Sequence, residues 1–238
     1  MSAIQLDHVA IAVSRMAEAP AVLIGVLGGA PTGAGGPSGA YTWAQWGFAG
    51  GGRLEILEPL GNDGFLSRFL ATRGPGIHHV TFKVPDLDAV CTQAEAHGFR
   101  VVGRDESDPS WAEAFLHPKE AQGVVVQLVE SRVPEPPRPP FPALAGPADP
   151  PAPVTILGLR TSTRAAEQAD TLWRVVLAGR RRGATYRWPG SPLRIVVDVN
   201  PAADEGPLAI DYTATRIVRW PGGEPVALGT RFQGVHDD

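Results

Sequence analysis

Four polar side chains hold matching positions in two stretches of this sequence, and all four are competent metal ligands. His8 and His79 lie 71 positions apart, and Glu55 and Gln127 lie 72 positions apart. One repeat therefore relates the two histidines to each other and Glu55 to Gln127. Two imidazoles, a carboxylate and an amide oxygen bind a divalent ion without neutralising it fully, which leaves coordination positions for a substrate.

Such a site supports proton removal from a carbon next to a carbonyl group. Two adjacent substrate oxygens chelate the ion, which stabilises the enediolate that forms when the proton leaves. A nearby carboxylate must accept that proton. Glu55 is the only carboxylate of the four residues. It is therefore the candidate for both metal ligand and catalytic base.

The ligand candidates lie on the polar sides of predicted strands. After His79, apolar residues at 80, 82 and 84 alternate with Thr81 and Lys83, which is the period of a half-buried strand. His78 is in phase with the apolar residues, so the adjacent histidines should point to opposite faces of the sheet. The same alternation follows His8.

These stretches, in this order, resemble the vicinal oxygen chelate superfamily, which contains glyoxalases, bleomycin resistance proteins and dioxygenases. The resemblance covers residues 4–130 and is nearest to methylmalonyl-CoA epimerases and glyoxalase-like proteins. It rests on Asp-His-Val-Ala-Ile-Ala-Val, Leu-Glu-Ile-Leu-Glu-Pro, Gly-Ile-His-His-Val-Thr-Phe, and Leu-His-Pro-Lys followed by Gly-Val-Val-Val-Gln-Leu.

The resemblance implies an α+β fold of paired βαβββ modules that form a curled, cup-shaped mixed β-sheet with flanking helices. Each module would give two ligands to one divalent ion: His8 and Glu55 from the first, His79 and Gln127 from the second. The modules would span about 1–62 and 74–131, so that residues 1–131 form the metal site.

The composition changes after this pair of modules. Ten prolines among residues 134–153 predict an extended, semi-rigid linker over 132–153. Residues 154–238 resemble a degenerate additional βαβββ-like module without metal ligands. Gly158 is aligned with His8, and Arg194 is aligned with Glu55.

Several functions remain open at this point. The leading one is a glyoxalase-like isomerase, epimerase or lyase that uses zinc, nickel, cobalt or manganese. Gln127 stands where the epimerases carry a glutamate, and a single base favours a one-base proton shift over inversion. The alternatives are a ring-cleaving, iron-dependent dioxygenase of the same superfamily and a non-catalytic protein that binds or sequesters a small molecule.

Composition limits the partners. The net charge of −4 and the lack of a long basic run argue against nucleic acid. Cys91 is the only cysteine, which points to a reducing compartment. No signal-like segment and no apolar run of roughly 20 residues is present, so we expect a cytoplasmic protein without membrane contact. The expected partner is a small molecule with vicinal oxygens, bound by a monomer or homodimer.

Local patterns give further predictions. Ser14 is expected to cap the first helix, and residues 30–39, rich in Gly, Pro and Ser, are expected to form a mobile loop. A helix with Cys91 in its buried stripe should begin after Asp86. Glu58 and Glu130 are expected at strand ends, where water reaches them.

Overall fold

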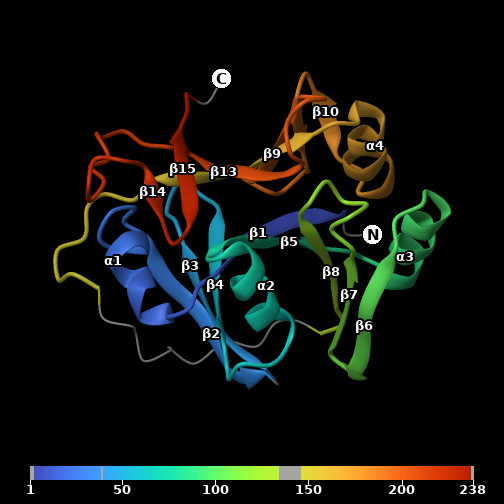
Figure 1. Ribbon diagram of the computed structural model, residues 1–238, viewed down its shortest axis with the longest axis horizontal. Coiled ribbons are helices and arrows are strands. Elements are labelled where there is room, and N and C mark those ends of the chain that lie inside the picture. Colours follow the sequence, from blue (N-terminus) through green and yellow to red (C-terminus); the bar gives the residue numbers. More distant parts are fainter. Residues whose placement is uncertain (1–2, 39, 134–145, 237–238) are drawn as a thin grey trace. The chain divides into compact units, whose positions relative to one another are not determined.

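The computed structural model describes residues 3–38, 40–133 and 146–236 (Figure 1). These residues form two compact units. One contains residues 3–8, 79–133 and 158–208, and the other contains residues 9–78, 146–157 and 209–236. Each unit thus combines segments from both halves of the sequence. Most of the predicted linker lies outside the described residues.

The first βαβββ module begins with a buried strand and a short helical segment. Its first and last strands run parallel, with Val9 opposite Leu54, and the remaining strand pairs are antiparallel. A connecting helix follows and ends at its C-cap residue, Gly74. The elements are β1 Gln5–Ala12, the 3-10 helix η1 Met16–Glu18, α1 Ala19–Leu23, β2 Ala30–Ser38, β3 Tyr41–Gly47, β4 Arg53–Pro59 and α2 Phe65–Arg73.

The prediction of a mobile loop over residues 30–39 is wrong, because residues 30–38 form β2. Gly35 lies opposite Trp43 of β3, and a Cβ atom at residue 35 would lie 2.2 Å from the Trp43 indole nitrogen. The absence of a side chain at Gly35 leaves room for the Trp43 indole ring, and the segment is a paired strand. β2 is an edge strand, where a residue such as Pro31 is tolerated because the missing N–H is not needed for pairing.

The second module repeats the arrangement of the first. Its first and last strands also run parallel, with Thr81 opposite Gln127, and the remaining strand pairs are antiparallel. The predicted helix is confirmed: Asp86 caps it by accepting a hydrogen bond from the Ala89 N–H, and Cys91 is buried. The elements are β5 Gly76–Lys83, α3 Leu87–Ala96, β6 Val101–Asp108, β7 Trp111–Leu116 and β8 Val125–Ser131.

A carboxylate from the last strand caps the helical segment of each module. Glu58 accepts a hydrogen bond of 2.8 Å from the Met16 N–H, and Glu130 accepts one of 2.8 Å from the Leu87 N–H. These carboxylates satisfy N–H groups that have no partner within the helix. Both glutamates lie near strand ends and are partly exposed, as predicted, but their capping contacts were not predicted. The predicted Ser14 cap is wrong, since the cap position is Arg15, without a side-chain bond.

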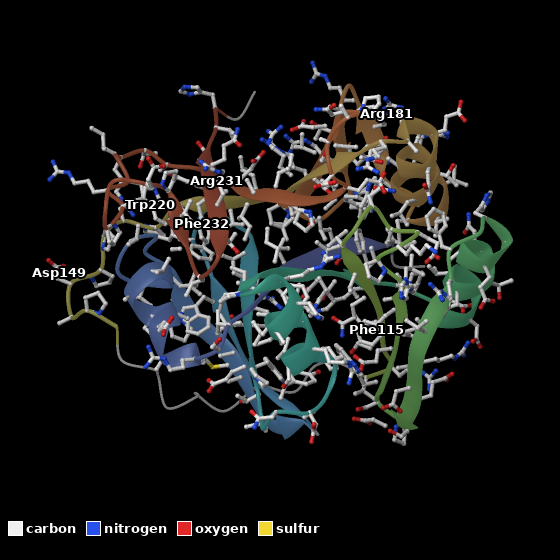
Figure 2. All side chains as sticks on the ribbon, in the orientation of Figure 1. Phe115, Asp149, Arg181, Trp220, Arg231 and Phe232 are labelled. Carbon is white, nitrogen blue, oxygen red and sulfur yellow. The ribbon has the colours of Figure 1, made fainter. Side chains whose placement is uncertain are left out.

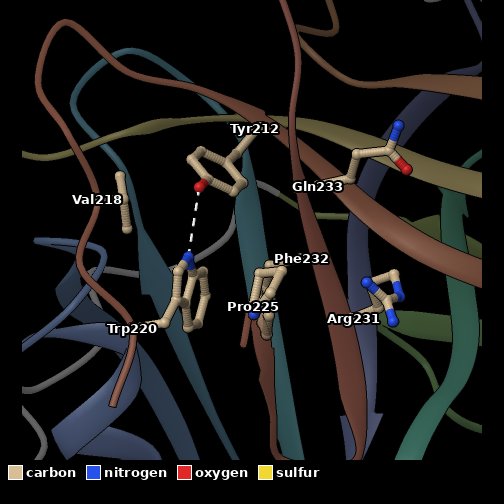
Figure 3. Close-up of a pocket in the computed structure, with 8 residues that line it drawn as sticks. Tyr212, Val218, Trp220, Pro225, Arg231, Phe232 and Gln233 are labelled. Carbon is tan, nitrogen blue, oxygen red and sulfur yellow. Dashed lines mark hydrogen bonds between the residues drawn. The ribbon is translucent and has the colours of Figure 1, made fainter. Parts of the chain in front are cut away.

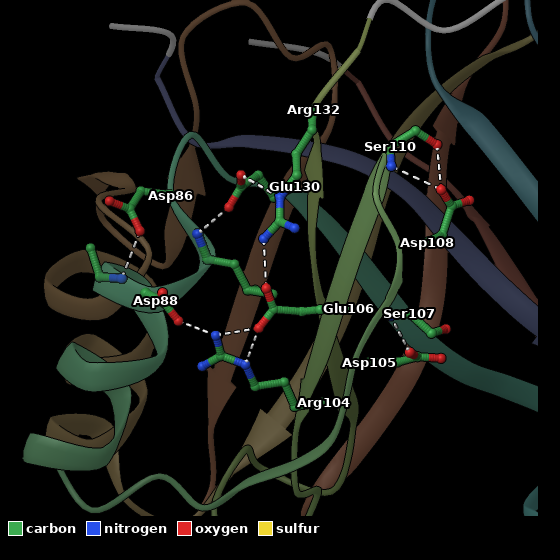
Figure 4. A network of polar contacts seen from close by, with 12 residues as sticks. Asp86, Asp88, Arg104, Asp105, Glu106, Ser107, Asp108, Ser110, Glu130 and Arg132 are labelled. Atoms are coloured by element: carbon green, nitrogen blue, oxygen red, sulfur yellow. Dashed lines mark hydrogen bonds and ion pairs between the residues drawn. The ribbon is translucent and has the colours of Figure 1, made fainter.

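Ion pairs extend the second of these caps into a network between α3 and the strands (Figure 4). Arg132 bonds both Glu130 and Glu106, and Arg104 bonds both Glu106 and Asp88. The side chains of this network are partly exposed, so each pair adds little to stability. Together they fix α3 against β6 and β8.

The C-terminal half contains a third βαβββ set and then three further strands. Its helix packs on the second module within their unit, where the Trp173 indole N–H donates to Gln122 over 2.9 Å and Phe82 contacts Trp188. The elements are β9 Thr155–Thr163, α4 Ala166–Asp170, the π-helix η2 Thr171–Val176, β10 Arg180–Arg182, β11 Thr185–Arg187, β12 Arg194–Val199, β13 Gly206–Thr213, β14 Val226–Ala227 and β15 Thr230–Gly234.

Hydrogen bonding arranges the strands in two mixed sheets. The first has the order β2-β3-β4-β1-β5-β8-β7-β6, and the second has the order β10-β11-β12-β9-β13-β15-β14. In both, the first and last strands of a module lie side by side at the centre. Among the described residues, no helix is long and apolar enough to cross a membrane.

Tyr212, Trp220 and Phe232 form an aromatic cluster next to the C-terminal strands (Figure 3). Trp220 stacks on Phe232, with ring centroids 5.1 Å apart, and its indole N–H lies 3.4 Å from the Tyr212 hydroxyl. The cluster borders a cavity of about 340 Å³. Arg231 and Gln233 lie on the other side of β15 from these rings, as strand alternation requires.

Candidate metal centre

His8, Glu55 and His79 come together as the repeat predicts. Their ligand atoms all lie within 4.8 Å of one another, and the three side chains are buried. The two imidazole centroids are 6.0 Å apart, with the ring planes at 64°. Among the residues that the structure describes, this is the one group of at least three His, Cys, Asp or Glu side chains with such spacing.

Strand register explains the grouping. Ala10 of β1 lies opposite Glu55 of β4, and His8 is two residues before Ala10. Since side chains alternate along a strand, His8 and Glu55 share a face of the sheet. The second module has the same offset, because His79 is two residues before Thr81, the partner of Gln127.

Gln127 reaches this group through a threonine. The Thr81 hydroxyl donates to Gln127 Oε1 over 2.6 Å, and the same oxygen of Thr81 is 2.9 Å from His8 Nε2. Gln127 Nε2 donates to Glu113 Oε2 over 2.9 Å. The amide oxygen therefore points to the side on which His8 lies. A role for Gln127 as a ligand stays a prediction.

A carboxylate orients the His8 ring. His8 Nδ1 lies 2.7 Å from Asp7 Oδ2, and Asp7 Oδ1 lies 3.2 Å from the Lys83 ammonium. Metal-binding histidines commonly donate their second ring N–H to such a group, which fixes the ring and its tautomer. Nε2 is thereby the nitrogen that His8 presents to the other ligand candidates.

An amide holds Glu55 in the first module. Gln45 lies opposite Glu55 on β3, and its Nε2 donates to Glu55 Oε2 over 2.7 Å. Both side chains are buried. Gln45 and Glu113 were not predicted from the sequence. Strand alternation can place each on one face of its strand, but the register of the hairpins decides which ligand candidate it meets.

His78 has a different role from its neighbour. Its ring packs on Phe65 and Phe69 of α2, with centroids 5.5 and 4.9 Å away. Burial lowers the pKa of His78 to about 4, against the raising effect of Glu55 and with a smaller lowering effect of Arg73. A neutral histidine under a helix fits the prediction that His78 and His79 face opposite sides.

The donor set fits a divalent cation. Imidazole nitrogens and a carboxylate oxygen suit zinc, cobalt, nickel, manganese and iron(II). The three donors come from three different strands and are buried. Burying polar groups together is unfavourable unless they bind a common partner such as a cation. His8, Glu55 and His79 would hold such an ion, and Gln127 is the candidate for the fourth position.

The third module does not repeat this donor set. Arg194 lies directly opposite Gly158, so Val196, not Arg194, occupies the position that matches Glu55 when Gly158 is matched to His8. The alignment of Arg194 with Glu55 is therefore wrong by two residues. Gly158 has φ +123°, and a Cβ atom there would lie 2.0 Å from the Arg194 carbonyl oxygen. No imidazole fits at this position.

We expect Gly158→Ala to lower the free energy of unfolding by roughly 2–4 kcal/mol, because backbone strain and a backbone clash add. Gly183→Ala is the control: φ is +60° there, and nothing lies within 4 Å of the added Cβ. It should cost about 1 kcal/mol. Urea unfolding measures both, and equal losses would show that the close approach to Arg194 is not what excludes side chains at residue 158.

About half of this chain is similar in sequence to known proteins. The family model of the Glyoxalase/Bleomycin resistance protein/Dioxygenase superfamily matches residues 7–115. Mitochondrial methylmalonyl-CoA epimerase from Homo sapiens is 28% identical over 136 residues, which cover 53% of this chain and 74% of the relative. The crystal structure of methylmalonyl-CoA epimerase from Mycobacterium tuberculosis is 30% identical, covering 55% of this chain and 89% of that chain, with a TM-score of 0.49.

A likeness in fold extends further along the chain. A mutant of 4-hydroxymandelate synthase from Streptomyces coelicolor matches 90% of this chain and 72% of its own, with a TM-score of 0.62 and 14% identity. It confirms the predicted fold class, a curled mixed sheet of βαβββ modules with an additional module. The family match over residues 7–115 and the epimerase relatives show that this part of the chain belongs to the glyoxalase/bleomycin resistance protein/dioxygenase superfamily.

Proposed function

We propose that this protein is a divalent-metal-dependent enzyme that moves a proton on a carbon next to a carbonyl group, as an isomerase, epimerase or lyase. The observation that carries the proposal is the buried group of His8, Glu55 and His79, with ligand atoms within 4.8 Å of one another. When bound, a divalent ion supplies Lewis acidity that stabilises negative charge developing on substrate oxygens.

Glu55 is the proposed base. It is the carboxylate of the group, and the Gln45 amide holds one of its oxygens from the neighbouring strand over 2.7 Å. A hydrogen-bond donor fixed on one oxygen directs the other oxygen and limits the rotation of the carboxylate. Proton transfer requires such placement before any matching of pKa values.

The proposed substrate is a small carbonyl compound with two adjacent oxygens. The name of the relatives, methylmalonyl-CoA epimerase, makes acyl-CoA thioesters one class to test. 2-Hydroxycarbonyl compounds are the other class, because one base suffices to move a proton between their neighbouring carbons. Inversion needs a proton donor on the second face. The amide of Gln127 is a poor one.

A ring-cleaving dioxygenase is the second candidate. Two histidines and one carboxylate are the donor set of non-haem iron(II) oxygenases, and the cluster has this composition. Gln127 Oε1 accepts a 2.6 Å hydrogen bond from Thr81, an arrangement in which Gln127 would support the site rather than complete it. In this reading Glu55 is a ligand only.

Metal analysis of protein purified without added metal separates the candidates. One zinc, nickel, cobalt or manganese ion per chain supports proton transfer. Iron, together with oxygen uptake on catechols, supports the dioxygenase. A protein that takes up no divalent ion, even after incubation with each metal, contradicts both and leaves a non-catalytic binding protein.

A further inference from the structure

Each module carries a carboxylate and a carboxamide that bond across neighbouring strands, but the two modules place them in opposite order. In the first module Glu55 is on the last strand, and Gln45 donates to it from β3 over 2.7 Å. In the second module Gln127 is on the last strand and donates over 2.9 Å to Glu113 on β7. The ligand position thus carries a carboxylate in one module and an amide in the other.

The reversed order has a consequence for Gln127. A carboxamide has a donor end and an acceptor end, and only its oxygen binds a cation. An ionised carboxylate accepts hydrogen bonds and donates none, so Glu113 can bond only the NH2 end of Gln127. That contact turns Oε1 away from Glu113, toward the Thr81 hydroxyl that lies 2.9 Å from His8 Nε2.

Glu113 does not itself belong to the ligand group. Its side chain is half-buried, and it is absent from the set of buried donors within 4.8 Å of one another. It stands diagonally across from Gln127, because Phe115, labelled on β7 in Figure 2, is the residue directly opposite. The Trp111 indole N–H lies 3.4 Å from the Glu113 oxygen that Gln127 contacts. Glu113 therefore contacts the ligand candidates through Gln127 and is not itself a member of the ligand group.

We infer that Glu113 is a positioning residue, whose carboxylate orients the Gln127 carboxamide so that its oxygen faces the metal centre. The inference rests on the proposed function for the role of the oxygen as a ligand. The orienting contact itself exists without metal. The two parts can therefore be tested separately.

The first test uses metal-free protein. The side-chain NH2 signals of Gln127 in a ¹⁵N–¹H spectrum are assigned by their loss in Gln127→Glu. The hydrogen bond to a carboxylate should separate the two hydrogen signals, and Glu113→Gln, which keeps the shape of the side chain, should shift them. Gln127 signals that are the same in wild type and Glu113→Gln would overturn the inference.

The second test measures metal affinity by titration with Co²⁺ and Zn²⁺. Glu113→Gln should weaken binding about 10- to 100-fold, the usual effect of losing a partner that orients a ligand. The exchange variant Glu113→Gln/Gln127→Glu should restore at least wild-type affinity, because a carboxylate at residue 127 needs no orienting. Glu95→Gln, an exposed carboxylate on α3, is the control and should bind metal as wild type does.

The outcomes separate the inference from the proposed function. Additive losses in the exchange variant would mean that Glu113 has only a structural role, and the inference would be wrong. Wild-type protein that binds neither ion, with Gln127 signals that still respond to Glu113→Gln, would remove the proposed metal site while supporting the orienting contact.

Discussion

Replacing His79 with alanine should abolish binding of a divalent ion, with a loss of affinity greater than about 100-fold. This exceeds the 10- to 100-fold effect of losing an outer partner, because a donor atom itself disappears. The remaining donors of the group, His8 and Glu55, would leave the ion mostly bound by water. Metal content after dialysis and titration with Co²⁺ measure the effect.

His117→Ala is the matched control for this change. His117 is a partly exposed histidine in the same unit, 3.1 Å from the Arg100 guanidinium and 3.4 Å from a Glu120 oxygen, outside the ligand group. It should keep one ion per chain. If a protein with both His8→Ala and His79→Ala retained its metal and its thermal stability, the assignment of the site would be wrong.

Glu55→Gln should separate metal binding from proton transfer. The amide oxygen still coordinates, as that of Gln127 is proposed to do, so metal is retained with reduced affinity. An amide cannot accept a proton at neutral pH. Exchange of the substrate proton with solvent should therefore fall by at least about 100-fold, the lower end of the usual contribution of a general base. Deuterium incorporation into 2-hydroxycarbonyl compounds and acyl-CoA thioesters measures it.

Glu18→Gln is the control for Glu55→Gln, since Glu18 is an exposed carboxylate of the same module that pairs with Arg15. It should exchange at the wild-type rate. Exchange that survives in Glu55→Gln would assign the base to another residue. Complete loss of metal in that variant would instead show that the carboxylate charge is needed for binding.

The sequence predicts the ligand group because alternation and repeat are both one-dimensional signals. His8 and His79 precede apolar alternation of the same phase, and the 71- and 72-residue separations put Glu55 and Gln127 in the same register. In each module the first and last strands pair so that the histidine lies two residues before the partner of Glu55 or Gln127. The two pairs of residues therefore occupy equivalent places in their modules. The parts of the site that follow this rule are those that could be predicted.

The residues that support the ligands could not be predicted in the same way. Gln45 meets Glu55, and Glu113 meets Gln127, only because of the register of the β3–β4 and β7–β8 hairpins. The sequence does not show that register. Arg194 illustrates the same limit. The sequence alignment matched it to Glu55, but the observed register of β9 and β12 gives that position to Val196.

Local composition gave a wrong prediction for residues 30–38, because glycine occurs both in flexible loops and where a large side chain packs against the backbone. Glycines between 30 and 38 suggest flexibility, yet Gly35 accommodates the Trp43 indole in a paired strand. Glu58 and Glu130 lie at partly exposed strand ends, as predicted. The sequence does not show that their carboxylates also bond the N–H groups of helical segments that lie more than 40 residues earlier in the chain.

The most direct test of metal-dependent proton transfer compares one wild-type preparation in two states. Protein stripped of metal with a chelator and protein reloaded with one equivalent of Zn²⁺, Co²⁺, Ni²⁺ or Mn²⁺ are incubated in D2O with the same panel of carbonyl compounds. We predict deuterium at the carbon next to the carbonyl of at least one compound with a reloaded protein, and none with the stripped protein. Equal exchange in both states, or no exchange with any metal on any compound, would contradict the account.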